Sequence, residues 1–119
     1  MRKQYTKQKI SKLPKAVEDC HQLIKWMISH IDKFPRARKF TLGDRIESKL
    51  LQILEDLVAA SYLKDKRSLL QRANLNLEVT RHLWRLAFEL KSIAVKSFEY
   101  GARLMFELGR QIGGWLKAA

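Results

Sequence analysis

The side chains best suited to chemistry lie between Phe34 and Glu47, in the segment FPRARKFTLGDRIE. Arg36, Arg38 and Lys39 place three positive charges close together, and no acid interrupts them. Guanidinium and ammonium groups form charge-assisted hydrogen bonds with phosphate oxygens. We therefore expect this segment to contact phosphate, and the alternative is ordinary surface charge balanced by the two acids that follow it.

The charge of the whole chain points the same way. Its 119 residues contain 24 Lys and Arg against 12 Asp and Glu, a net charge of +12. A basic protein binds polyanions because each neutralised phosphate releases condensed counterions. Nucleic acid is favoured over a membrane as the partner, since no apolar run approaches the ~18 residues that span a bilayer, and the basic N-terminus lacks the apolar segment of a signal peptide. These features predict a cytoplasmic protein.

The residue pattern does not support catalysis or metal binding. His21, His30 and His82 fall on different predicted helices or helix faces without the paired spacing of metal ligands. Cys20 is the only cysteine, which excludes an internal disulfide and suits a reducing compartment. Gly113 and the glycine after it lack the lysine of a phosphate-binding loop, and no nucleophile is paired with a base. We expect no enzyme activity, no metal and no cofactor.

Helices must position these side chains, because apolar residues recur at spacings of three and four along most of the chain. The pattern predicts a helix over residues 15–33, a second from Leu42 to about Tyr62, and a third that follows the charged turn at 64–67 and runs to about Lys91. A fourth helix follows a weak break at residues 92–97. Four helices joined by short connections predict an all-α, antiparallel up-down-up-down four-helix bundle over residues 16–119.

Residues 1–15 differ in composition from the rest of the chain. They hold six Lys or Arg and no acid, with Ile10 and Leu13 as isolated apolar residues. This composition predicts a mobile basic tail, which either binds nucleic acid or only keeps the protein in solution.

The connection between the first two predicted helices carries stop and start signals. Pro35 has no backbone donor and disfavours a helical conformation at Phe34, so the first helix should end there. Thr41 is a good N-cap for the next helix, and Asp44 at its third position completes a variant capping box. The basic residues between these signals would then lie in a loop.

The third predicted helix has apolar residues on two opposite sides. Leu70, Leu77 and Trp84 share one side and face the bundle core. A second apolar side on a monomer would meet water, and contiguous exposed apolar patches usually mark association sites. We therefore expect a homo-oligomer, with scattered surface apolar residues as the alternative. The expected interface residues are Leu75, Val79, His82, Leu86 and Leu90.

Two basic surfaces follow from this arrangement. The first and third connections of an up-down-up-down bundle share an end, which brings together Arg36, Arg38, Lys39, Arg45, Lys49, Lys91 and Lys96. Free N–H groups at the start of the second helix would add to phosphate binding there. Arg81 and Arg85 form a lateral surface on the third helix, where pairing with Glu78 and Glu89 in a salt-bridge network is the alternative.

Three blocks of sequence carry a family resemblance. The segment FPRARKFTLGDRIE, with LWRLAFELK at residues 83–91 and GRQIGGWLK at residues 109–117, resembles the accessory variability determinant (Avd) proteins of diversity-generating retroelements. The likeness covers roughly Val17 to Lys117 and leaves the basic residues before Lys15 outside it. The related four-helix group named after ribosomal protein S23 is less similar, because its Ser/Arg/Ala-rich, Asn-containing segment after the first helix is missing here.

The resemblance implies a non-catalytic subunit that assembles into a closed pentamer. It implies that this subunit holds RNA or another nucleic acid beside a reverse transcriptase during mutagenic cDNA synthesis, and that the surface with Arg81 and Arg85 engages the reverse transcriptase or the nucleic acid. No base-reading motif is present, so binding should be nearly independent of sequence. The alternative function is a four-helix protein–protein adaptor with no nucleic-acid role.

Overall fold

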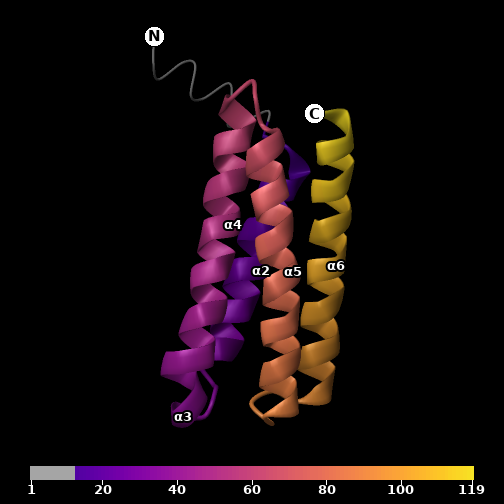
Figure 1. The fold of residues 1–119 in the computed structure, drawn as a ribbon. Helices are drawn as coiled ribbons and strands as arrows, with labels where there is room; N and C mark the ends of the chain where they lie inside the picture. Colours follow the sequence, from indigo (N-terminus) through magenta and orange to yellow (C-terminus); the bar gives the residue numbers. More distant parts are fainter. Residues whose placement is uncertain (1–12) are drawn as a thin grey trace.

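The computed structural model describes residues 13–119, which form four long helices and no strand. The helices are α2 (Lys15–Ile31), α4 (Asp44–Tyr62), α5 (Arg67–Glu89) and α6 (Val95–Ala118). They lie side by side along one long axis (Figure 1). The predicted all-α class is confirmed, and the arrangement is that of a helical bundle.

The contacts between helices define their order around the bundle. α2 packs against α4 and α6, and α5 packs against the same two neighbours. Asp56 in the second half of α4 accepts a hydrogen bond from Arg72 in the first half of α5, with Oδ1 and Nη2 2.7 Å apart. Trp84 Nε1 near the end of α5 donates to the carbonyl oxygen of Phe98 in the first turn of α6, at 3.0 Å. α4 and α5, and likewise α5 and α6, therefore run in opposite directions.

Large apolar side chains from all four helices fill the interior. Each helix places them at spacings of three and four, so that one face of each is buried. Removing one such side chain from water contributes about 1.5–3 kcal/mol to folding. The largest fully buried side chains are Leu23, Met27, Ile46, Leu50, Ile53, Leu57, Leu70, Leu77, Trp84, Met105, Leu108 and Ile112.

One carboxylate is buried beside this core. Asp56 is only 2% exposed and accepts hydrogen bonds from Arg72 Nε at 3.0 Å and Arg72 Nη2 at 2.7 Å. Gln52 Nε2 donates to the same carboxylate at 3.2 Å. Hydrogen bonding to Asp56 holds the pKa of the Arg72 guanidinium above its usual value. This pair fastens α4 to α5, and the sequence pattern did not predict it.

The connection between α2 and α4 differs from the prediction. Helical backbone resumes directly after Pro35, as the short helix α3 (Arg36–Arg38) and the π-helical turn η1 (Lys39–Gly43). Arg38 N donates to the carbonyl oxygen of Pro35 at 2.8 Å, which closes the first turn. The predicted basic loop is therefore wrong. A proline that precedes a helix has no N–H to leave unpaired, so Pro35, which follows the end of α2 at Ile31, permits the next helix to begin.

The predicted N-cap at Thr41 is also wrong. Its hydroxyl donates to the carbonyl oxygens of Ala37 at 3.2 Å and Arg38 at 3.4 Å, inside the helical stretch. No side-chain cap is present at η1 or α4. Because the chain is already helical from Arg36, the backbone donors near Thr41 bind carbonyl oxygens of the preceding turn.

Most of the predicted basic tail lies outside the described residues, which begin at residue 13. Leu13 packs against the core, and Lys15 opens α2 with its Nζ 2.8 Å from Asp19 Oδ2. The described end of the predicted tail thus belongs to the bundle.

Candidate functional site

One end of the bundle collects most of the predicted basic site. α3 and η1 lie at the lower end of Figure 1, where the connection between α5 and α6 also lies. α3, η1 and the start of α4 contribute Arg36, Arg38, Lys39 and Arg45. The connection between α5 and α6 contributes Lys91, and the first turn of α6 contributes Lys96. We call these six residues the basic end.

The charges of the basic end are not neutralised by neighbouring acids. Within residues 13–119, none of its six side chains has a carboxylate oxygen within 4.0 Å. Four of the six are exposed, and Arg38 and Lys39 are half-buried. Arg38 Nε is buried and has no hydrogen-bond partner in the described chain. Such a cluster can bind phosphate groups, because its cations retain their hydrogen-bonding capacity.

Lys49 is half-buried between α4 and α5, and its Nζ lies 3.4 Å from Asn76 Oδ1 on α5. Its part in the basic surface stays a prediction. One other predicted contribution to this surface is wrong. The N–H groups expected to be free at the start of the second helix lie within the helical stretch, where Asp44 N donates to the carbonyl oxygen of Thr41.

A groove lined by both apolar and charged side chains, Asp44 among them, adjoins the basic end. It has a volume of about 750 Å³ and lies between η1, the start of α4 and the end of α5. Phe40, Leu86 and Leu90 line it together with Arg38 and Arg45. Phe40 is 62% exposed, which is unusual for so large an apolar side chain. The groove joins the basic end to the apolar side of α5.

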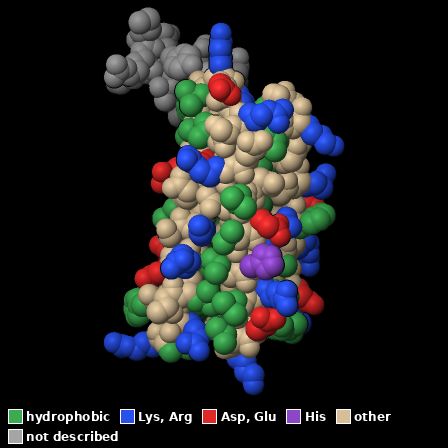
Figure 2. Space-filling model, in the orientation of Figure 1, with side chains coloured by type: hydrophobic (Ala, Val, Ile, Leu, Met, Phe, Trp, Pro, Cys, Tyr) green, Lys and Arg blue, Asp and Glu red, His purple; other side chains and the backbone are tan. Residues whose placement is uncertain are grey.

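The second apolar side of α5 is exposed in the single chain. Leu75 is 64% exposed, Leu86 and Leu90 are also exposed, and Val79 is half-buried. His82 is exposed, with Nε2 3.8 Å from Glu78 Oε2. We call the predicted interface residues Leu75, Val79, His82, Leu86 and Leu90 the apolar stripe. Figure 2 shows apolar side chains in a band along the face of α4 and α5, with Lys and Arg on both sides of it.

Arg81 and Arg85 are engaged by neighbouring groups. Arg81 Nη1 lies 3.6 Å from Glu78 Oε1, and Arg81 Nη2 donates to the carbonyl oxygen of Met105 on α6 at 3.3 Å. Arg85 Nε lies 3.1 Å from Glu89 Oε2. The salt-bridge network that stood as the alternative is present, so the lateral surface is closer to neutral than the basic end.

The structure also assembles an aromatic cluster that the sequence analysis did not identify. Trp26 and His30 on α2 stack with ring centres 4.0 Å apart, and Tyr100 on α6 lies 5.0 Å from Trp26. The spacing of four between Trp26 and His30 was a usable signal, because such residues share a helix face. Tyr100 could not be added to them without knowing how α6 packs on α2.

Several observations limit the chemistry of the described residues. Among residues 13–119, no three His, Cys, Asp or Glu side chains gather in a way that could hold a metal ion. Burial raises the pKa of the Cys20 thiol to about 12, so the thiol remains protonated and unreactive at neutral pH. No helix in this part of the chain is long and apolar enough to cross a membrane.

The fold and the site define a class: small helical-bundle proteins with one basic end and an exposed apolar side. A family model described as bAvd-like matches residues 6–119, and the chain belongs to that family. The resemblance to Avd proteins of diversity-generating retroelements is thereby confirmed. The match begins before Lys15, so part of the basic N-terminal segment lies inside the family region, contrary to the expectation. No curated protein matches the chain.

Proposed function

We propose that the protein is a non-catalytic accessory subunit of a diversity-generating retroelement. In this role it binds template RNA or another nucleic acid, together with the reverse transcriptase, and positions them for mutagenic cDNA synthesis. The polymerase chemistry belongs to the partner. Membership of the bAvd-like family supports the accessory role, and the cytoplasm is where the complex would act.

The basic end supports the nucleic-acid part of the proposal. Its six cations have no carboxylate partner within residues 13–119, whereas Arg81 and Arg85 both do. A phosphate that approaches the basic end displaces no internal salt bridge. Binding through phosphates releases counterions and does not depend on base sequence, so we expect a steep salt dependence and little sequence preference.

We further propose that the subunit is an up-down-up-down bundle that assembles into a closed homo-oligomer, a pentamer by family resemblance. The apolar stripe supports this assembly, because its large apolar side chains otherwise face water. The same stripe is the feature that favours the second candidate function, a protein–protein adaptor whose basic residues serve only solubility.

The test compares charge reversal at the two basic surfaces. Fluorescence anisotropy of labelled RNA and of an equal-length DNA duplex is measured at two salt concentrations. Arg36→Glu with Arg38→Glu should weaken binding roughly tenfold or more and lower the slope of log affinity against log salt by about 2. Arg81→Glu with Arg85→Glu is the matched control and should have the smaller effect.

The opposite ranking, with binding kept in the first variant and abolished in the second, would place nucleic acid on the lateral surface. Wild-type protein that binds neither ligand at low salt would contradict the nucleic-acid role and leave the adaptor.

A further inference from the structure

The aromatic cluster forms a short ladder across α2 and α6. The rings of Trp26 and His30 are stacked with an interplanar angle of 29°, and Tyr100 is tilted by 49° against Trp26. Arg103 continues the series, with its guanidinium carbon 5.7 Å from the centre of the Tyr100 ring. One cation and three aromatic rings thus follow one another along the surface.

Packing below the ladder holds it in place. A Cβ on Gly101 would stand 2.9 Å from Trp26 Cζ3, so the glycine is what allows the Trp26 ring to approach α6. The buried ring of Trp84 lies edge-on to Trp26, with centres 5.8 Å apart. His30 Nδ1 donates to the carbonyl oxygen of Trp26, with the two atoms 3.0 Å apart. The rings are therefore arranged before any ligand arrives, which lowers the entropy that binding must overcome.

The ladder is partly open to solvent, chiefly at Tyr100. Tyr100 is 43% exposed, and Trp26 and His30 are half-buried. It lies toward the end of the bundle that carries the basic end, because α2 ends and α6 begins there. An exposed aromatic series beside free cations differs from the closed core of the bundle, where Trp84 has no exposed surface.

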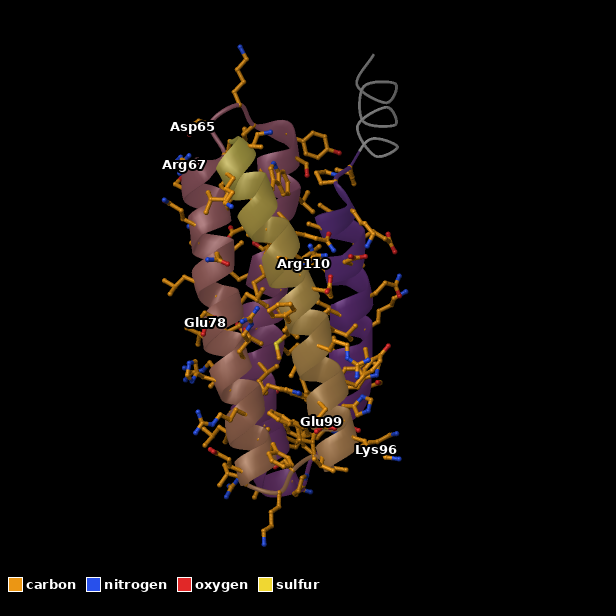
Figure 3. The ribbon with its side chains drawn as sticks, turned by 90° about the vertical axis from the view of Figure 1, so that its right-hand side faces the viewer. Asp65, Arg67, Glu78, Lys96, Glu99 and Arg110 are labelled. Carbon is orange, nitrogen blue, oxygen red and sulfur yellow. The ribbon has the colours of Figure 1, made fainter. Side chains whose placement is uncertain are left out.

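Two cations on α6 lie near Tyr100, one before it and one after it along the helix. Lys96 precedes Tyr100 by one helical turn and Arg103 follows it by one turn, which places both near its face of α6. Figure 3 shows Lys96 at the lower end of α6, on the side of α2. Within residues 13–119, neither side chain has a carboxylate oxygen within 4.0 Å. This holds although Glu99 lies between Lys96 and Arg103 in the sequence.

We infer that the ladder of Trp26, His30 and Tyr100 is a stacking site for unpaired bases of a single-stranded nucleic acid, whose phosphates contact Lys96 and Arg103. Bases stack on aromatic rings and on Arg guanidinium planes without regard to sequence, and nearby cations contact the phosphates of the nucleic-acid backbone. Paired bases in a duplex already stack on each other and present only their edges and phosphates. The site would thus give the protein a preference for single strands that the basic end alone does not supply. This inference rests on the proposed nucleic-acid function.

The test uses the full-length protein and two labelled probes, an unstructured single-stranded RNA and an RNA duplex of equal length. Tyr100→Ala should weaken binding of the single strand roughly 5- to 150-fold, the range for loss of one base–aromatic stack. Duplex affinity should stay within about two-fold. The salt slope for the single strand should not change, because stacking releases no counterions. Tyr100→Phe keeps the ring and should keep the affinity.

Phe106→Ala is the matched control, because Phe106 is an exposed aromatic residue on the same helix but outside the ladder. Circular dichroism establishes that each variant is folded, and His30→Ala tests the other end of the ladder if Tyr100→Ala does not fold. Equal single-strand affinity of Tyr100→Ala, His30→Ala and Phe106→Ala would overturn the stacking site. If charge reversal at Arg36 and Arg38 still weakened binding in that case, the proposed function would stand without the stacking site.

Discussion

At the residue scale, Lys91 has the least expected backbone conformation. It is the one non-glycine residue with positive φ in the described chain, at 62°. It ends α5, and Ser92 N donates across it to the carbonyl oxygen of Ala87 at 2.9 Å. This is the C-terminal motif that glycine usually completes, because a Cβ in the left-handed region costs about 1–2 kcal/mol. The protein retains a lysine where the backbone favours glycine.

The strain at Lys91 predicts the outcome of two substitutions. Lys91→Gly should raise the free energy of unfolding by about 1 kcal/mol, measured by chemical denaturation, because glycine adopts this backbone without the Cβ penalty. Lys91→Ala is the control, since it removes the same charge but keeps the Cβ, and it should bring no gain. If the proposed basic end is correct, both variants lose nucleic-acid affinity to the same extent. Equal stability of the two variants would contradict the strain.

At the scale of the element, α6 is shaped by its glycines. A Cβ on Gly101 would stand 2.7 Å from Nε1 and 2.8 Å from Cε2 of Trp84, closer than real Cβ atoms come. A Cβ on Gly109 would stand 2.6 Å from Arg81 Nη2. Gly113 has no such neighbour within 4 Å. The first two glycines let rings and a guanidinium cross close to the backbone, and the third is free of that constraint.

Alanine substitution should therefore act in opposite directions along one helix. Gly101→Ala should lower the free energy of unfolding by about 1–3 kcal/mol, because the rigid Trp84 ring is fully buried and cannot move aside. Gly113→Ala should raise it by up to about 1 kcal/mol through helix propensity alone. Thermal melts followed by circular dichroism measure both. A stabilised Gly101→Ala protein would mean that the two helices separate at no cost.

At the scale of the whole molecule, the face of α4 and α5 carries the apolar stripe, and the aromatic ladder lies between α2 and α6. These two faces lie on opposite sides of the bundle, because α2 and α5 each pack between α4 and α6. The apolar stripe therefore does not itself cover the ladder, although in a closed ring it would pack on a different face of the next subunit. The basic end connects both faces at one end of the molecule (Figure 1).

The apolar stripe predicts the effect of charged substitutions on the proposed assembly. Leu75→Glu with Leu86→Glu should convert the proposed oligomer into folded monomers of about 14.0 kDa, measured by light scattering coupled to size exclusion. The reason is that burying two unpaired carboxylates in a subunit interface is strongly unfavourable. Leu63→Glu is the control, because Leu63 is 52% exposed but lies outside the stripe. An unchanged mass of the double variant would exclude the stripe as the interface.

The sequence predicts an element correctly where the signal is local. It predicts the wrong element where one signal permits two structures. The helix spacing predicted α2, α4, α5 and α6 because each exposes its own periodicity. Pro35 predicts a helix stop followed by a loop, yet it also permits a helix start. Tertiary contact decided between them: a Cβ on Gly43 would stand 2.8 Å from Ile31 Cγ2, and Phe34 is buried. The end of η1 therefore lies close against the end of α2.

The sequence by itself determined the all-helical class, the excess of positive charge and the family, because periodicity, composition and short motifs are properties of neighbouring residues. Only the tertiary structure decided which cations are paired, because the partner of a charge can lie on another helix. Within residues 13–119 the basic end has no carboxylate partner, whereas Arg72, Arg81 and Arg85 each have one. It also brought Tyr100 to Trp26, an arrangement that depends on the packing of α6 against α2. Contacts between distant segments follow from how helices dock, and no local pattern encodes them.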